Sequence, residues 1–192
     1  VEVELNTLEQ DFSAIEKIVF ANASLTERLE NTGILTEGIA WDHAVIGVVG
    51  RASGIDRDLR RDRPFAAYDV LQPKVALYRY GDVRARMRVR LDEIHESIRL
   101  IREVRRGLPL GRLVTRPMHE AQPGVWALSA VEGWRGEILY VVMAGDAGRI
   151  HRCKVRDPSF VNWPAIQWAA LGNIVPDFPL INKSFNLSYA GN

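Results

Sequence analysis

Residues 124–157 read "GVWALSAVEGWRGEILYVVMAGDAGRIHRCKVRD", and this stretch decides the fold. Side chains alternate with a period of two in the runs 124–133, 136–145 and 149–157, which is the pattern of β-strands. Tight turns that contain glycine join the runs, and such turns connect antiparallel neighbours. The stretch therefore predicts a small three-stranded antiparallel meander, with the residue at position 135 at the tip of its first turn.

Helical periodicity dominates much of the remaining chain. Apolar residues three or four apart follow the capping residue Asp82, so a helix is expected to reach Arg106, with Pro109 marking its end. A capping box at Thr7 predicts a long amphipathic helix that stops at Gly33. Thr36 is expected to start a short helix, and the two glycines at 47 and 50 to end it.

The C-terminal quarter predicts a helix over residues 160–171 capped by Ser159, and then a short helical turn set up by Pro176 and Pro179. Residues 51–81 show no sustained periodicity. We therefore predict an α+β fold, mainly long helices with the small meander, in a single domain over residues 1–192.

The composition excludes several classes of function. The formal net charge of +1 favours neither nucleic acid nor an anionic membrane, and the apolar runs are too short to span a bilayer. With one cysteine, Cys153, the chain can form neither an internal disulfide nor an all-cysteine metal cage. Cys153 is expected to be a half-buried structural thiol in a reducing, cytoplasmic setting.

Residues 82–106 are rich in arginine, which raises nucleic-acid binding as an alternative. Acidic residues lie among the arginines and no stacking aromatics do, so a solvated or ion-paired face is the favoured interpretation. The arginines are Arg84, Arg86, Arg88, Arg90, Arg99, Arg102, Arg105 and Arg106. The four histidines, at 43, 95, 119 and 151, are too scattered to form a local metal motif.

Two charged stretches need a functional explanation. "GIDRDLRRD" carries too many charges to be buried unpaired, and "EGWRGE" holds Arg135 between two glycines as a donor directed outward. We take Arg135 as the candidate catalytic residue. The candidate cofactor-binding or interface network consists of Arg51, Asp56, Asp58, Arg60, Arg61 and Asp62.

Three segments resemble one superfamily in order and spacing. They are "RASGIDRDLRRDRPFAAYD", "YGDVRARMRVRLDEIHESIRLI" and "VEGWRGEILYVVMAGDAGRIHRCKVRDPSFVNWPAI". The superfamily contains the D (49-kDa) subunit of respiratory complex I and the large subunits of membrane-bound nickel–iron hydrogenases, and the hydrogenase-4 and formate hydrogenlyase branch is the more similar one. The resemblance implies a nickel–iron hydrogenase large-subunit-like fold and the C-terminal portion of a longer large subunit.

The resemblance also assigns roles and reveals two departures. Arg135 matches the arginine that projects over the nickel–iron centre of hydrogenases, although Trp134 stands where the family commonly has proline. In metal-bearing members an Asp-Pro-Cys-x-x-Cys motif supplies two nickel ligands near the end of the chain. "SFNLSYAGN" places Ser188 and Gly191 at these cysteine positions, so these are degenerate ligand positions and no metal is expected.

The resemblance therefore implies part of a complex I-like NADH:quinone oxidoreductase or hydrogenase-4-type large subunit. Electrons would come from an iron–sulfur cluster held by a partner small subunit and reach a quinone, with NAD(H) bound only by other subunits. We expect the isolated fragment to be inactive and the complex to lie peripherally on the cytoplasmic side of the inner membrane. The alternatives are an active nickel–iron hydrogenase or formate hydrogenlyase large subunit, and a non-catalytic assembly module.

Overall fold

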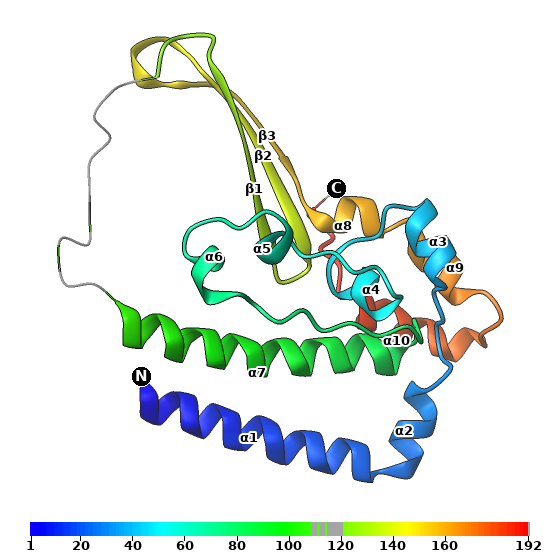
Figure 1. Ribbon diagram of the computed structural model, residues 1–192. Helices are drawn as coiled ribbons and strands as arrows, with labels where there is room; N and C mark the ends of the chain where they lie inside the picture. The colour runs from blue at the N-terminus through cyan, green and yellow to red at the C-terminus, as the bar shows by residue number, and fades with distance from the viewer. Residues whose placement is uncertain (109–110, 112–113, 115–120, 192) are drawn as a thin grey trace.

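The computed structural model describes residues 1–108, 111, 114 and 121–191 (Figure 1). Helices dominate, and one three-stranded sheet extends away from them (Figure 1). The predicted α+β class, mainly helical with a small antiparallel meander, is confirmed. The helices are α1 Glu2–Ala21, α2 Ala23–Leu29, α3 Glu37–Asp42, α4 Gly47–Ala52, α5 Leu59–Asp62, α6 Tyr68–Leu71, α7 Val83–Gly107, α8 Pro158–Asn162, α9 Ala165–Ala170 and α10 Phe178–Phe185. Short 3₁₀ turns cover Asp146–Gly148 (η1) and Val175–Asp177 (η2).

The sheet has the predicted topology. β1 (Trp126–Gly133), β2 (Gly136–Ala144) and β3 (Ile150–Arg156) pair antiparallel in the order β1-β2-β3. Gly133 pairs with Gly136, so the first hairpin turns through only two residues, 134 and 135. The second connection contains η1, and the pairing of β2 with β3 shifts register beyond Met143.

The predicted cap of α7 is also present. The Asp82 carboxylate accepts a hydrogen bond from the Ala85 N–H at 2.7 Å, and the helix continues to Gly107. Pro109, expected to mark the end of this helix, lies outside the described residues. The α1 helix lies alongside α7, and several α7 arginines pair with its glutamates, as in Arg102 with Glu9 at 2.8 Å (Figure 1).

The N-terminal helix differs from its prediction. It begins at Glu2, so Thr7 lies inside α1, where its hydroxyl donates to the Val3 carbonyl at 3.0 Å instead of capping. The helix then breaks at Asn22, whose side chain accepts from the Leu25 N–H at 3.0 Å and starts α2. An asparagine side chain competes with the helical backbone in this way, and the apolar periodicity of the sequence does not reveal the break.

Two further boundaries were wrong. Gly47 and Gly50 were expected to end a helix, but both belong to a separate helix, α4. The predicted helix over 160–171 is two helices, because Pro164 between them has no N–H to donate. Asp157, not Ser159, caps α8, and it accepts from the Ser159 N–H at 2.7 Å. The irregular segment 51–81 contains two short helices, α5 and α6.

The main hydrophobic core lies where α3, α4, α9 and α10 meet the start of α7. Leu35, Val45, Val49, Ile181 and Phe185 are each at most 2% exposed in it. Leu187, which follows α10, is buried in the same core, so the segment after α10 is packed against the body of the protein.

Arg86 is the main departure from the ion-paired arginine face predicted for α7. It is 0% exposed, and it donates to the Gly81 carbonyl at 2.7 Å and the Gly33 carbonyl at 2.9 Å. Its Nε donates to the Ser184 hydroxyl at 2.8 Å, and its guanidinium lies 4.6 Å from the centre of the Phe185 ring. Burial lowers the pKa of Arg86 to about 9. A single arginine therefore connects the loop before α3, the start of α7 and helix α10.

We expect Arg86→Met to lower the free energy of unfolding by more than about 3 kcal/mol, because the carbonyls of Gly33 and Gly81 and the Ser184 hydroxyl lose charged donors in a buried place. Urea denaturation of the variant measures this loss. The control is Arg106→Met, which changes an exposed arginine of the same helix and is expected to stay within about 0.5 kcal/mol. Equal losses in the two variants would contradict the role given to Arg86.

Candidate functional site

A buried ion network surrounds Arg51, which is 1% exposed. Its guanidinium lies 2.5 Å from a Glu93 oxygen on α7, 3.0 Å from a Glu132 oxygen on β1 and 3.6 Å from an oxygen of Asp58. A buried guanidinium is stable only with such partners, because the cost of removing its charge from water is several kcal/mol. Arg51 therefore joins α4, α7, the start of α5 and the sheet.

The structure divides the six predicted network residues into two groups. Asp58 is fully buried and receives Nε and Nη2 of Arg60 at 2.9 and 2.6 Å. Burial acts to raise the pKa of Asp58, but the hydrogen bonds from Arg60 and the charge of Arg51 outweigh it, so the pKa is lowered. The other three residues form a more exposed pair of contacts, in which Arg61 lies 2.6 Å from Asp56 and 2.7 Å from Asp62. Only the first group, which contains Arg51, Asp58 and Arg60, belongs to the buried network.

Glu132 and Glu137 were not singled out from the sequence, although both are central. They face each other directly across the β1–β2 hairpin. Like charges directly opposite each other destabilise a hairpin, so this pair requires nearby cations that offset the repulsion. Glu132 contacts Arg51, and Glu137 accepts from Arg57 at 2.8 Å and from Arg156. Burial raises the pKa of Glu132 above its usual value. The sequence could have indicated this, because a glutamate on each strand beside a two-residue turn places two like charges opposite each other, and such a pair requires nearby cations.

The hairpin tip lies directly on the backbone of α4. A Cβ atom added to Gly47 would lie 2.0 Å from the Arg135 carbonyl oxygen and 2.6 Å from the Gly136 Cα. Gly47 also has φ of +66°, a conformation that other residues adopt at a cost. The two glycines of the contact, one on each segment, allow the tip to sit against the start of α4, and this fixes where residues 134 and 135 lie.

Arg135 contacts the segment that follows α10. Its Nε donates to the Asn186 carbonyl at 2.6 Å, and its guanidinium lies 4.7 Å from the centre of the Trp134 ring. Arg90 of α7 lies on the same ring at 5.7 Å and donates to the Phe185 carbonyl at 3.3 Å. Burial is the main reason that the pKa of Arg90 falls to about 10, and the charge of Arg135 acts in the same direction.

The predicted degenerate ligand positions lie just beyond this contact. The Ser188 N–H donates to the Ser159 hydroxyl at 2.9 Å, and the Ser188 carbonyl accepts from the Trp163 indole at 3.1 Å. A Cβ atom at Gly191 would lie 2.7 Å from an Asp157 carboxylate oxygen. Residues 186–191, which we call the tail segment, are therefore held between Arg135 on one side and α8 on the other.

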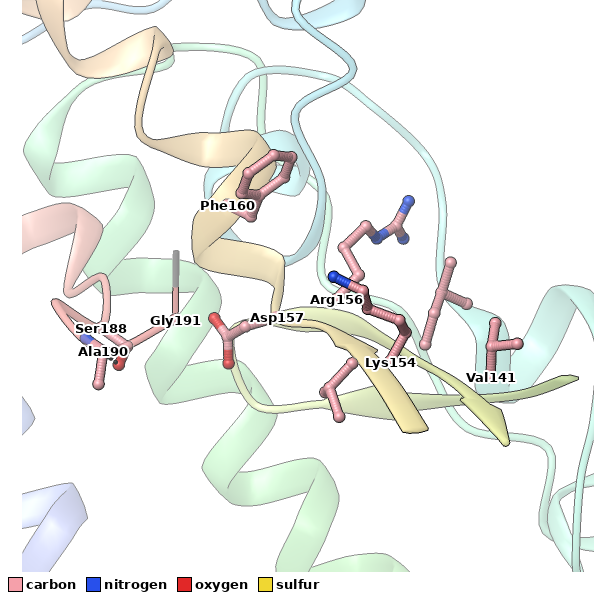
Figure 2. A pocket seen from close by; sticks show the side chains of 10 residues that line it. Val141, Lys154, Arg156, Asp157, Phe160, Ser188, Ala190 and Gly191 are labelled. Atoms are coloured by element: carbon pink, nitrogen blue, oxygen red, sulfur yellow. Dashed lines mark hydrogen bonds between the residues drawn. The ribbon is translucent and has the colours of Figure 1, made fainter. Parts of the chain in front are cut away.

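A groove of about 610 Å³ lies between the tail segment and the base of the sheet. Figure 2 shows its lining, with the Asp157 carboxylate pointing toward the segment that contains Ser188 and Gly191. Leu139, Val141, Val155 and Phe160 supply apolar surface, and Lys154, Arg156, Asp157 and Ser188 supply polar groups. The structure thus combines an apolar wall with cationic, anionic and hydroxyl groups.

The donor set of the groove does not fit a nickel–iron centre. The side chains that it offers to a metal are the Asp157 carboxylate and the Ser188 hydroxyl, whereas a site of the hydrogenase kind requires soft thiolates. Cys153 is exposed on the edge strand β3, so the prediction of a half-buried thiol was wrong. Within the described residues no group of three or more His, Cys, Asp or Glu side chains could hold a metal, and His119 lies outside them.

Residues 1–125 and 113–191 match the family described as the 49 kDa subunit of the respiratory-chain NADH dehydrogenase. The chain belongs to this family. It is 34% identical over 165 residues to the carbon monoxide-induced hydrogenase of Rhodospirillum rubrum, and the match covers 86% of this chain and 45% of the relative. It is 30% identical over 183 residues to formate hydrogenlyase subunit 5 of Escherichia coli (strain K12), and the match covers 95% of this chain and 32% of the relative.

The matching NADH-quinone oxidoreductase subunit of Clostridium beijerinckii is also 30% identical over 183 residues, with 95% of this chain and 50% of the relative covered. The chain thus spans half or less of the length of these 49 kDa family relatives. One chain in the structure of the membrane-bound sulfane sulfur reductase, an archaeal respiratory membrane complex, shares this fold. The TM-score is 0.85 at 23% identity, and the match covers 96% of this chain and 52% of that chain. The superfamily predicted from the sequence is confirmed.

The geometry of the hairpin tip makes one prediction. Gly47→Ala is expected to destabilise the protein by about 2–5 kcal/mol, because a methyl group adds backbone strain and collides with the Arg135 carbonyl. Thermal or urea unfolding measures the loss. Gly38→Ala is the matched control in helix α3, where an added Cβ meets nothing within 4 Å and stability should stay equal or rise. A variant at Gly47 as stable as the control would show that the tip is not in contact with α4.

The buried network makes a second prediction. Asp58→Asn is expected to cost about 3–5 kcal/mol near neutral pH, because Arg51 and Arg60 lose a buried counter-charge. The fold lowers the pKa of Asp58 below its usual 3.8. The carboxylate therefore stabilises the protein fully above that pH, and the stabilisation is lost progressively as the pH falls from there through the lowered pKa of the folded state.

The difference in unfolding free energy between the parent protein and Asp58→Asn should therefore shrink as the pH falls below about 4. Urea titrations across that range measure it. The control Asp56→Asn removes an exposed partner of Arg61 and should cost less than about 1 kcal/mol. A difference that stays constant down to about pH 2, or that grows as the pH falls, would exclude this account of Asp58.

Proposed function

We propose that this chain is the C-terminal part of a complex I-like large subunit that delivers electrons to a quinone bound in the groove beside the tail segment. The electrons would come from an iron–sulfur cluster in a partner subunit, and NAD(H) would be handled by other subunits. The single observation that carries the proposal is the donor set of the groove. Apolar side chains and oxygen or nitrogen donors line it, and none of its side chains is a thiolate.

The lining suits a quinone in two ways. The side chains of Leu139 and Phe160 can pack on a planar ring and its tail. Reduction of a quinone to a quinol takes two electrons and two protons, so negative charge develops on the ring oxygens. The Ser188 hydroxyl can donate a hydrogen bond to such an oxygen. Asp157 caps α8 and also lines the groove.

Arg135 acts on the groove through the tail segment. Its Nε holds the Asn186 carbonyl, two residues before Ser188, and thereby orients the segment that forms one wall. Arg90 holds the segment in the same way by donating to the Phe185 carbonyl, one residue before Asn186. The exposed group of network residues, Asp56, Arg61 and Asp62, is suited to an interface and not to the groove, since none of them lines it.

The assembly proposed here is a peripheral one on the cytoplasmic side of the inner membrane. Among the described residues, no helix combines the length and the apolar character needed to cross a bilayer. The relatives include NADH-quinone oxidoreductase subunits and a hydrogenase, and the solved neighbour is a respiratory membrane complex. These names support a large subunit that works in contact with an iron–sulfur subunit and other partners.

A hydrogenase is the second candidate, because two of the relatives are named a carbon monoxide-induced hydrogenase and a formate hydrogenlyase subunit. The two candidates differ in metal content and product. Nickel at one equivalent per full-length protein, together with hydrogen evolution, would establish the second candidate and exclude the first.

The test uses the full-length protein in its assembled complex. Arg135→Ala is expected to lower quinone-dependent turnover at least about tenfold while the complex still assembles, because the tail segment loses a charged hydrogen-bond donor. Arg135→Lys should restore part of the turnover, since lysine can still donate to the Asn186 carbonyl. Arg106→Ala is the control and should leave the turnover unchanged. The nickel content of the parent complex should be far below one equivalent per full-length protein. Normal turnover in an assembled Arg135→Ala complex would favour the non-catalytic assembly module instead.

A further inference from the structure

No segment among residues 1–108 and 121–191 covers either face of the outer half of the sheet. Figure 1 shows the strands extending beyond the helices that pack against their base. Trp126 is 64% exposed, Leu128 is 60% exposed and Ile150 is 66% exposed. A two- or three-stranded sheet gains its stability by covering an apolar face, so apolar side chains in this position usually mark a surface that another molecule covers.

The strand register separates the two faces. Directly paired residues lie on the same face, so one face carries the rows Trp126–Met143–Arg152 and Leu128–Val141–Lys154. We call this surface the cationic face. The opposite face carries the rows Ala127–Val142–Cys153 and Ser129–Tyr140–Val155, which include no charged residue. Only the cationic face therefore has a charge pattern that selects a partner.

Each row of the cationic face begins with two apolar residues and ends with a cation on β3. A third row nearer the helices, Ala130–Leu139–Arg156, follows the same pattern, but Arg156 pairs with Glu137. Within residues 1–108 and 121–191, no carboxylate lies at ion-pair distance from Arg152 or Lys154. These two exposed cations are thus available to carboxylates from outside the described part of the chain.

The spacing of the two cations indicates the shape of the partner. Arg152 and Lys154 are two residues apart on a strand, which is about 6.8 Å. Residues four apart on an α-helix are separated by about 6 Å along its axis and lie on the same side. An acidic pair at that spacing can face both cations while the apolar stripe of the same helix covers the Trp126–Met143 and Leu128–Val141 rows.

We propose that the cationic face is the docking surface for an amphipathic helix of a partner protein, with two carboxylates four residues apart beside an apolar stripe. A protein helix fits better than a membrane surface because the apolar and cationic residues form parallel lines along the strands. The anionic headgroups of a membrane attract cations through a diffuse surface potential and supply no fixed spacing that would match Arg152 and Lys154. Val141 and Lys154 of this face also line the edge of the groove. The test detects the docked helix and not a quinone, so failure of this inference and failure of the proposed function are distinguishable.

The test places a photo-crosslinking amino acid at Leu128 in the full-length protein in its native membranes, with a matched probe at Ser129 on the opposite face. We expect Leu128 to link to one protein segment that contains the acidic pair and apolar stripe, and Ser129 not to reach that segment. Crosslinks only to lipid, only to a second copy of the protein, only to another part of the same chain, or to a segment without acidic residues would each overturn the proposal, as would no crosslink.

Charge exchange then tests the recognition itself. Arg152→Glu should lower the yield of the Leu128 crosslink at least about tenfold, because a cation becomes an anion opposite a carboxylate. Replacing the facing carboxylate of the partner by lysine should restore the yield. Arg106→Glu, a charge reversal at an exposed arginine on α7, should leave it unchanged. Arg152 is exposed on an edge strand, so its variant should keep the parent melting temperature. Loss of yield without restoration by the exchanged pair would overturn the proposal.

Discussion

The buried guanidinium of Arg51 is the constraint on which the rest of the candidate site depends. Its partners, Asp58, Glu93 and Glu132, come from a loop, a helix and a strand that are far apart in the sequence. None of these groups can be buried alone at an acceptable cost, so the elements that carry them must assemble together. The network thus fixes the sheet against α4 and α7 and gives the first hairpin a definite position.

A short series of contacts from the hairpin also fixes the position of the tail segment. The hairpin tip lies on Gly47, Arg135 projects from the tip to the Asn186 carbonyl, and Arg90 reaches the carbonyl before it. The groove is formed between this segment and the base of the same sheet. Helices, hairpin and tail segment therefore form a single structural unit around the groove, although local sequence periodicity relates none of them to one another.

Features that depend on neighbours in the sequence could be predicted, and features that depend on tertiary contacts could not. The meander and the Asp82 cap follow from alternation and from one side chain near its own helix. From the sequence, Gly47 is expected to end a helix. In the structure it begins helix α4, because the absence of a side chain lets the hairpin tip lie against it. Arg86 belongs to an apparently solvated arginine row, and only the packing of α10 shows that it is buried. The hairpin pattern singled out Arg135, and the family resemblance then gave it a role and directed attention to the tail segment.

The contact between the hairpin tip and α4 is made by backbone atoms and glycines on both sides. The location of residues 134 and 135 is consequently independent of which side chains they carry. A scaffold of this kind separates the placement of a reactive group from its chemical identity. Substitutions at these two positions can exchange a ring, a cation or an imino acid at an unchanged point in space, so the chemistry beside the tail segment can diverge while the architecture that supports it is conserved.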